Sequence, residues 1–282
     1  SGDLVLHMSK EHFPHPHFAD MPYYVFVHSC LAIELRGGVA PWVPRKQDQP
    51  AFMDLERQLF QNARKVFTGA HYVQEFMRRD YGVNPEKLAL GGGAADDYFI
   101  NNMPSAPANE LRKNLIMVGW DYGMKGGPTA VEALSIARKT IPDLTLTLVG
   151  PPPETLPDAP GLIKVGPLRD RTRLLQYYRD ADIFILPSLY DTFGFVFCEA
   201  MSQGLPCIGT EFNAIPEFIE PGINGYLVPR RDPQTLAARI IEFYVNPANR
   251  FRMGQSSMQR VHKAFTWDHV ADRLLAGMKE SL

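Results

Sequence analysis

The sequence predicts an α/β protein made of two doubly wound halves that face each other across a cleft. Short, almost uninterrupted apolar runs alternate with helical runs along most of the chain, which is typical of parallel sheets covered by helices on both faces. The alternation stops once, at residues 101–114, which are rich in Asn, Pro, Ser and Ala and show no period; we interpret them as a linker. A chain of 282 residues is long enough for two ordinary domains.

The block before the linker begins with strands. Its expected strands cover residues 3–8, 23–29, 65–69 and 86–93, and its expected helices cover residues 51–63 and 71–82. Apolar residues at helical spacing predict the first helix. Gly82 predicts the end of the second, because glycine adopts the left-handed cap conformation without strain. Gly91–Gly93 are expected to let the backbone turn sharply after the last strand.

The block after the linker repeats the rhythm more regularly. Its expected strands cover residues 114–119, 144–153, 162–166, 182–188, 206–210 and 225–229, and its expected helices cover 126–140, 171–181, 194–204, 213–220, 232–246, 247–265 and 266–282. Ligands of such sheets bind beyond the carboxyl ends of the strands. The residues that follow each strand are therefore the first place to search for a site.

The bulk composition excludes several classes of protein. A net charge of −2 lacks the basic excess of nucleic-acid-binding proteins. Cys30, Cys198 and Cys207 lie in apolar surroundings and are too few for a disulfide framework, so we expect buried thiols in a reducing, cytoplasmic compartment. No apolar run in the sequence reaches the ~18 residues of a membrane-spanning helix.

The stretch "YDTFGFVFCEAMSQGLPCIGT" (190–210) carries two carboxylates in apolar surroundings. A helix that starts near Gly194 would present its first backbone N–H groups to a phosphate. Asp191 would lie in the loop before that helix, and Glu199 more than one turn inside it. A carboxylate can accept hydrogen bonds from two adjacent sugar hydroxyls. For an arbitrary loop and helix, a structural interpretation is favoured instead, in which Asp191 is a partner of the helix dipole and Glu199 a paired helix carboxylate.

Three other strand ends carry polar residues with a structural and a functional interpretation. Lys125 precedes two glycines and a helix start, where a lysine can meet a phosphate as a point charge or lie in solvent. His28 ends an apolar strand and fits a structural role as well as a reactive one. His12, His15 and His17 lie among prolines and phenylalanines, with no carboxylate spaced to complete a metal site, so we expect no metal.

The order of these motifs resembles the family 4 glycosyltransferases. In family order the chain carries "MPYYVFVHS", "LIMVGWDYGMKGG", "LTLTLVGPPP", "LLQYYRDADIFILPSLYDTFGFVFCEAMSQGLPCIGTEFNAIPEFIEPGINGYLVP" and "FTWDHVADRLL". The resemblance covers nearly the whole chain, and residues 177–229 are its most specific part. It implies the GT-B fold of two Rossmann-like halves. The implied halves are residues 1–108 with the closing helix 268–282, and residues 109–267 as the nucleotide-sugar-binding half.

The resemblance also implies roles for individual residues. Asp191 and Glu199 match the family's pair of acids, of which the first contacts the donor sugar and the second the ribose. Lys125 matches the phosphate-binding lysine, and His28 the histidine near the reaction centre. The remaining donor-binding residues that the resemblance implies are Phe193, Gly194 and Phe195 at the diphosphate, Gly119 at the strand end, and Gly166 to Leu168 at the nucleobase.

Three departures from the family pattern stand out. Asp191 replaces the usual glutamate, which keeps the charge but shortens the reach. Trp120 occupies the place of an arginine that partners Lys125, a charge that Arg169 or Arg171 would have to supply. Members also begin with a strand and a glycine-rich loop that this chain lacks. We therefore expect a shortened N-terminal half: a natural short form, a fragment, or one part of a split enzyme.

The resemblance implies a retaining transfer of a hexosyl group from a UDP-, GDP- or ADP-sugar to a hydroxyl acceptor such as a glycan or lipid-linked sugar, without metal or other cofactor. Two alternatives stay open: a nucleotide-sugar-binding subunit that is inactive without a partner chain, and a sugar-nucleotide epimerase. A hydrolase would need two carboxylates flanking the bond and is disfavoured. Peripheral membrane contact, a homodimer and a partner chain that supplies the missing segment also stay open.

Overall fold

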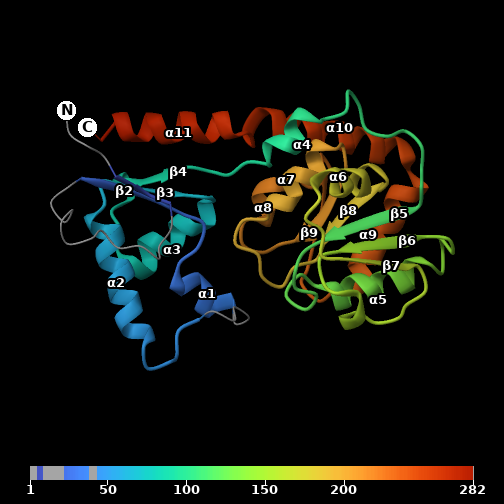
Figure 1. Ribbon diagram of the computed structural model, residues 1–282, viewed down its shortest axis with the longest axis horizontal. Coiled ribbons are helices and arrows are strands. Elements are labelled where there is room, and N and C mark those ends of the chain that lie inside the picture. Colours follow the sequence, from blue (N-terminus) through green and yellow to red (C-terminus); the bar gives the residue numbers. More distant parts are fainter. Residues whose placement is uncertain (1–4, 9–21, 38–42, 282) are drawn as a thin grey trace. The chain divides into compact units, whose positions relative to one another are not determined.

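The structure is a computed structural model that describes residues 5–8, 22–37 and 43–281. The chain forms two compact units (Figure 1). The first unit comprises Ser1–Gly93 and Trp267–Leu282, and the second comprises Ala94–Thr266. The sequence predicted a division after residue 108, whereas the compact units divide after Gly93, so that residues 94–108 group with the second unit.

The sheet of the first unit is parallel. Its strands, in spatial order, are β1 (Val5–His7), β2 (Tyr23–Val27), β3 (Lys65–Thr68) and β4 (Leu88–Leu90). The helices between them are α1 (Leu31–Gly37), α2 (Gln49–Asn62) and α3 (His71–Tyr81). These three helices lie on one face of the sheet, and α11 (Trp267–Lys279) lies on the other (Figure 1).

The last helix of the chain packs on the middle of this sheet. Gly277 of α11 lies so close to the Phe67 ring that an added Cβ would come within 2.6 Å of it. Next to this contact, Lys65 Nζ lies 2.7 Å from Glu280 Oε2, and the hydroxyls of Tyr24 and Ser281 are 3.1 Å apart. The residues predicted to form the closing helix therefore complete the first unit.

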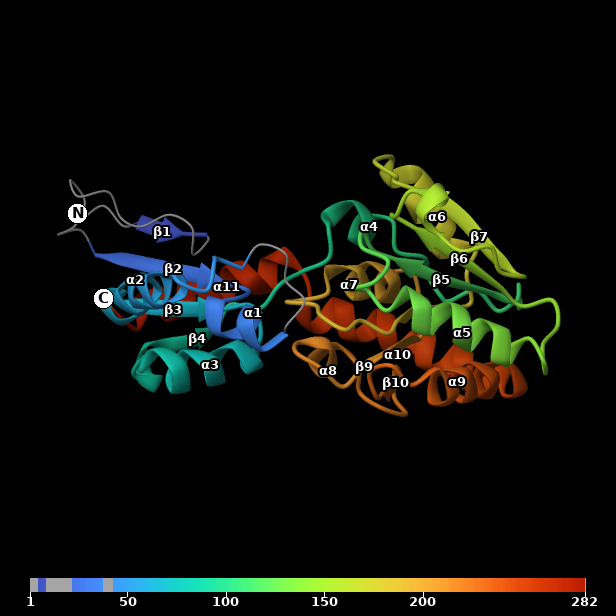
Figure 2. The same cartoon turned by 90° about the horizontal axis from the view of Figure 1, so that it is seen from below.

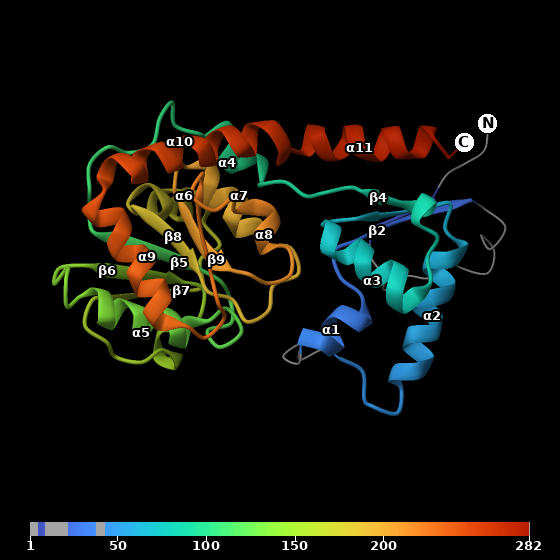
Figure 3. The same ribbon diagram turned by 180° about the vertical axis from the view of Figure 1, so that it is seen from behind.

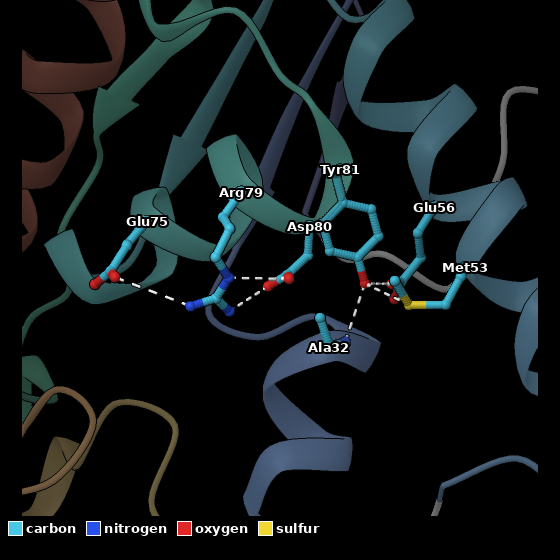
Figure 4. Close-up of polar contacts among 7 residues, drawn as sticks. All are labelled: Ala32, Met53, Glu56, Glu75, Arg79, Asp80 and Tyr81. Atoms are coloured by element: carbon cyan, nitrogen blue, oxygen red, sulfur yellow. Dashed lines mark hydrogen bonds and ion pairs between the residues drawn. The ribbon is translucent and has the colours of Figure 1, made fainter.

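The start of α1 is held by two side chains from the neighbouring helices (Figure 4). Both carboxylate oxygens of buried Glu56 accept from the backbone N–H of Leu31, at 3.0 and 3.2 Å. The Tyr81 hydroxyl donates to the same carboxylate and accepts from the N–H of Ala32 at 3.1 Å. Because the first N–H groups of a helix have no partner inside it, these contacts fix α1 and the end of the loop between β2 and α1.

The sheet of the second unit is also parallel. In chain order its strands are β5 (Asn114–Val118), β6 (Thr145–Val149), β7 (Leu162–Gly166), β8 (Ile183–Leu186), β9 (Cys207–Thr210) and β10 (Gly225–Val228). In space the order is β10-β9-β8-β5-β6-β7. The chain therefore builds outward from β5 in one direction, returns to β8, and builds outward in the other.

The helices follow from this order. They are α4 (Asp97–Asn101), α5 (Gly127–Ala137), α6 (Arg171–Arg179), α7 (Phe195–Ser202), α8 (Ile215–Phe218), α9 (Pro233–Val245) and α10 (Pro247–Ala264). Right-handed crossovers in opposite directions place their helices on opposite faces, and α5 and α6 lie on opposite sides of the sheet (Figure 2). Helix α9 returns to lie beside α5 (Figure 3). Two parallel sheets with helices on both faces, of which the second is doubly wound, confirm the predicted α/β class.

Most predicted elements are present at slightly different bounds. Gly82 ends α3 with φ 65°, as predicted. The strand predicted at 86–93 is shorter, because Pro85–Lys87 form a 3-10 turn and the backbone leaves the ladder after Leu90. Helices α1 and α4 were not predicted. They are short, and α4 begins inside the segment that follows the glycines, where Asp96 accepts from the N–H of Tyr98 at 2.9 Å.

Candidate functional site at the β5–β8 edge

Two predicted site residues meet where the strand order of the second unit reverses. Lys125 lies between β5 and α5, and Asp191 lies between β8 and α7. Strands β5 and β8 are neighbours, and their connections leave toward opposite faces, so their carboxyl ends form a topological switch point. There Lys125 Nζ lies 2.8 Å from Asp191 Oδ2, and the side chains are only 14% and 8% exposed.

The loop that carries Lys125 is a set of tight turns. The Asp121 carboxylate accepts from the N–H of Met124 at 2.6 Å, and the N–H of Lys125 donates to the Asp121 carbonyl at 3.0 Å. Gly126 has φ 76°, and an added Cβ would collide with the Pro187 carbonyl at 1.9 Å. Only glycine allows this close approach of the two loops, which brings Lys125 beside the end of β8.

The loop that carries Asp191 is tied to its surroundings by backbone contacts. The N–H of Leu189 donates to the Met124 carbonyl at 2.8 Å, which joins the two loops directly. The Asn213 side chain donates to the Asp191 carbonyl at 2.9 Å. The Thr210 hydroxyl donates to the Ser188 carbonyl at 2.9 Å. The Asp191 carboxylate therefore has a fixed position against Lys125.

Helix α7 begins directly after this loop. Gly194 is its N-cap, with φ 92°. The Phe193 ring before it is buried, 4.9 Å from the Phe218 ring in an edge-on arrangement, whereas Phe195 remains 38% exposed. The buried ring anchors the turn while the helix N-terminus follows the carboxylate. This arrangement combines a helix N-terminus and a lysine, the two groups that favour a bound anion.

Glu199 is held in place by a tyrosine. The buried Tyr178 hydroxyl of α6 donates to Glu199 Oε2 at 2.9 Å. Burial raises the pKa of Glu199 to about 7, the nearby Asp96 raises it further, and the Tyr178 hydrogen bond and Arg171 act against this shift. Burial thus shifts Glu199 toward its protonated form, whereas Asp191, eight residues earlier, has an ammonium partner.

The edge beside Lys125 is lined by glycines. The N–H of Gly119 donates to the Val149 carbonyl, and that of Gly150 to the Gly166 carbonyl, both at 3.0 Å. These bonds link the carboxyl ends of β5, β6 and β7, so Gly119 and Gly166 share one edge with Lys125. Leu168 follows two residues later and is half-buried. Trp120, which follows Gly119, is 59% exposed.

His28 belongs to the first unit, at the end of β2. Its ring meets the Phe26 ring edge-on at 4.9 Å between centroids. It also lies against Gly69, where an added Cβ would come within 1.9 Å of His28 Nδ1. Burial lowers the pKa of His28 to about 4. The imidazole is therefore neutral across the physiological range.

The described residues hold no group of three or more His, Cys, Asp or Glu side chains arranged to hold a metal ion. His12, His15 and His17 lie outside them. No helix in the described ranges is long and apolar enough to cross a membrane.

Sequence reasoning missed the partners of the predicted acids. The sequence pattern predicts Tyr178 to be a core residue of a helix. Its spacing gives no indication of a contact with Glu199, which lies 21 residues later. Asn213 adopts φ 51°, which hints at a special turn but not at its contact with Asp191. Arg171, considered as a substitute phosphate ligand, lies 2.8 Å from the Asp96 carboxylate.

The reversed strand order, the lysine–aspartate pair and the helix N-terminus define an α/β protein with charged groups gathered at a topological switch point. Residues 112–246 match the family model described as "Glycosyl transferases group 1". This part of the chain belongs to that family. The match spans β5 through α9, which carry Lys125, Asp191 and Glu199.

Similar proteins agree with this family. A D-inositol 3-phosphate glycosyltransferase from Jonesia denitrificans is 29% identical over 178 residues, 57% of this chain and 42% of that protein. The amylovoran biosynthesis glycosyltransferase AmsK from Erwinia amylovora is 32% identical over 131 residues, 44% of this chain and 32% of that protein. The alignments thus span less than half of these relatives.

A solved structure extends the likeness to the whole fold. The crystal structure of Anabaena Alr3699/HepE in complex with UDP superposes with a TM-score of 0.75, at 17% identity, over 94% of this chain and 74% of that one. The likeness shows the fold, which is GT-B, with two Rossmann-like units.

Proposed function

We propose that this protein transfers a hexosyl group, with retention, from a nucleotide diphosphate sugar to a hydroxyl acceptor such as a glycan or lipid-linked sugar. The observation that carries the proposal is the pairing of Lys125 with Asp191 at the β5–β8 switch point, inside the segment that belongs to the group 1 glycosyl transferases. Both named relatives are glycosyltransferases.

The proposed donor lies along the carboxyl edge of the second sheet. Lys125 and the amides at Phe193, Gly194 and Phe195 would hold the diphosphate, and Asp191 the sugar. The Glu199 carboxylate would accept from the ribose hydroxyls. Gly119 lines this edge, and the loop from Gly166 to Leu168 would meet the nucleobase. Because HepE is described in complex with UDP, a uridine diphosphate sugar is the first candidate.

In the proposed reaction the bond from the anomeric carbon to the β-phosphate oxygen breaks, and the diphosphate leaves with the electron pair. The acceptor oxygen forms the new bond to the same carbon, and its proton passes to the departing phosphate oxygen. Negative charge grows on the phosphate, where Lys125 and the helix amides would stabilise it; such preorganised donors supply much of the rate enhancement in other enzymes. The proposal needs no metal or other cofactor, since these groups carry the charge.

Two further parts of the proposal concern His28 and the location of the protein. His28 is a catalytic candidate through its resemblance to the family motif, and its neutral imidazole suits a hydrogen-bonding role. We propose a cytoplasmic location, because Cys30, Cys198 and Cys207 are buried thiols of the kind found in reducing compartments.

Calorimetric titration with UDP, GDP and ADP, followed by their sugar esters with and without sugar acceptors, tests the proposal. Binding of one diphosphate with acceptor-dependent sugar transfer supports it, and the anomeric configuration of the product tests retention. Glu199→Ala should weaken nucleotide binding by about 1–3 kcal/mol, because hydrogen bonds to a charged group are lost. Unchanged affinity would remove Glu199 from the donor site, and binding without turnover would favour a subunit that needs a partner chain.

A further inference from the structure

We propose that Arg230 is a positioning residue for sugar transfer, which holds the loop 188–191 from the end of β10 and so sets the place of the Asp191 carboxylate. The inference rests on the proposed function, because it takes this loop to be part of the donor site. Spacing along the chain does not indicate the contact, since Arg230 follows Leu189 by 41 positions.

The loop 188–191 is held by side chains from outside it. A segment that forms no helix or strand must find partners for its carbonyl groups elsewhere. Here four side chains donate to four successive carbonyls. The donors and carbonyls are Thr210 Oγ1 to Ser188 at 2.9 Å, Arg230 Nη1 to Leu189 at 3.2 Å, Lys125 Nζ to Tyr190 at 3.4 Å and Asn213 Nδ2 to Asp191 at 2.9 Å. The position of the loop is therefore set by residues that are remote from it in the chain.

Arg230 reaches the loop by crossing the end of the strand that lies between. In the sheet β9 separates β10 from β8, and neighbouring strands are about 4.7–4.9 Å apart. The guanidinium lies over the ring of Phe212, a residue that follows β9, with its central carbon 3.9 Å from the ring centroid. A planar guanidinium can stack on a ring and donate from its edge at the same time. The ring thus supports Arg230 in the orientation that meets the Leu189 carbonyl.

Arg230 is the exposed donor of the four. Thr210 is fully buried, and the Lys125 side chain is 14% exposed, whereas Arg230 lies at the surface. Loss of a surface side chain leaves no cavity in the core and usually changes the free energy of unfolding little. A substitution at Arg230 should therefore loosen the loop while the rest of the unit keeps its stability.

A looser loop should displace Asp191 and spare the groups proposed to hold the diphosphate. Asp191 follows Leu189 by two residues, so a shift of the Leu189 carbonyl is passed on to the carboxylate. Lys125 lies in a different loop, and the buried Phe193 ring anchors the turn before α7. Because a small misplacement of one reacting group lowers the rate steeply, turnover should fall while diphosphate affinity stays nearly unchanged.

The first measurement is hydrogen exchange of the backbone amides of the free protein, read by mass spectrometry. Arg230→Ala should speed exchange in the segment 188–194 by about two- to tenfold, the range expected for the loss of one hydrogen bond. Arg239→Ala is the matched control, because its guanidinium also lies over a ring of the same unit, 4.7 Å from the Tyr226 centroid, but belongs to α9. It should leave exchange in this segment unchanged.

A second variant tests the same contact from its other side. Phe212→Leu removes the ring beneath the guanidinium and should also speed exchange in the segment 188–194. The double variant should differ little from Arg230→Ala, because both substitutions remove one contact. If circular dichroism shows that Arg230→Ala does not fold, Phe212→Leu takes its place in every measurement.

The second measurement is turnover, followed as release of UDP, GDP or ADP from their glucose esters in the presence of sugar acceptors. Arg230→Ala should lower kcat by about tenfold, while calorimetric titration should show a change in the Kd of the diphosphate of less than about twofold. A merely structural loss would lower the folded fraction, and with it the binding stoichiometry, and would not separate kcat from Kd in this way.

Four results would count against the inference. Unchanged exchange in both variants would show that Arg230 does not hold the loop, and the proposed function would stand. Faster exchange with wild-type kcat would show that transfer does not depend on the position of the loop. Equal losses of kcat and diphosphate affinity would place Arg230 in contact with the ligand. If wild type releases no diphosphate from any of the three esters, the proposed function fails, and the role of Arg230 in transfer fails with it.

Discussion

The carboxyl ends of β2 and β8 look alike in the sequence, since each buried apolar strand runs into a polar loop, but the structure gives them opposite character. After β2, the His28 ring packs against Phe26 and Gly69, and its pKa falls to about 4. After β8, Asp191 meets an ammonium group at 2.8 Å. The first strand end is neutral, and the second carries a pair of opposite charges.

Strand order accounts for the difference. In the second unit the order reverses between β8 and β5, and the loops that follow these two strands bring a lysine and an aspartate together. In the described part of the first unit the strands follow one another in chain order. There the loop after β2 lies beside the end of β3, where the N–H of Gly69 donates to the Val27 carbonyl. The reversal of strand order thus accompanies the charged pair, and the unreversed order accompanies the neutral strand end.

The largest effect is expected from a substitution of Lys125, which belongs to the charged pair with Asp191. Lys125→Ala should lower turnover by about 10²–10³, because it removes a donor to the phosphate that develops charge. It should also weaken diphosphate binding far more than binding of the bare nucleoside, as titration with each would show. Lys139→Ala, an exposed lysine just beyond α5, is the matched control. Equal losses for diphosphate and nucleoside would place Lys125 away from the phosphate.

The next effect concerns Glu199, whose folded pKa of about 7 lies above its ordinary 4.5. The folded state therefore binds more protons than the unfolded state between these values, so wild-type stability should fall as pH rises from about 4.5 to 7. The full loss is up to about 3 kcal/mol, from 1.36 kcal/mol per pKa unit.

Glu199→Gln should remove this contribution. Urea unfolding at pH 5 and pH 8 should then show a smaller pH difference for Glu199→Gln than for wild type, with the variant relatively more stable at pH 8. The same difference in both proteins would mean that the Tyr178 hydrogen bond keeps Glu199 ionised throughout.

The lowered pKa of His28 should change the stability with pH in the opposite direction to Glu199, by a similar or smaller amount. Its folded pKa of about 4 lies below the ordinary 6.5, so the unfolded state binds more protons and stability should be lost as pH falls from about 6.5 to 4. His28→Gln should flatten that part of the profile. It should also lower turnover while leaving nucleotide affinity nearly intact. Wild-type turnover in this variant would return His28 to a purely structural role.

The smallest effect is expected from a substitution in the first unit, which should change the stability of the protein without changing its affinity for a diphosphate. Tyr81→Phe removes the hydroxyl that donates to Glu56 and accepts from Ala32 at the start of α1 (Figure 4). We expect a loss of about 1–2 kcal/mol in the free energy of unfolding. Diphosphate affinity should not change, because Lys125 and Asp191 belong to the second unit. A parallel loss of diphosphate affinity would contradict this separation.

The sequence by itself determined what depends on neighbouring residues. Apolar runs predicted β5 and β8, Gly82 predicted the end of α3, and the two acids eight positions apart marked the loop–helix turn at Gly194. Each of these depends on local periodicity or on a conformation that one residue type adopts readily. The resemblance to a family then ranked Lys125 above an ordinary surface lysine.

Only the tertiary structure decided which of these residues meet. Lys125 and Asp191 are 66 positions apart, and their contact depends on β8 returning to lie beside β5 rather than beyond β7. The contact between Tyr178 and Glu199 is likewise a tertiary one. Helices α6 and α7 precede and follow β8 in the chain, and the fold brings them together. Strand order and the direction of each crossover are long-range outcomes of packing. Spacing along the chain therefore predicted the helices and strands. Their arrangement in space brought Lys125 to Asp191 and buried Glu199, which raises its pKa.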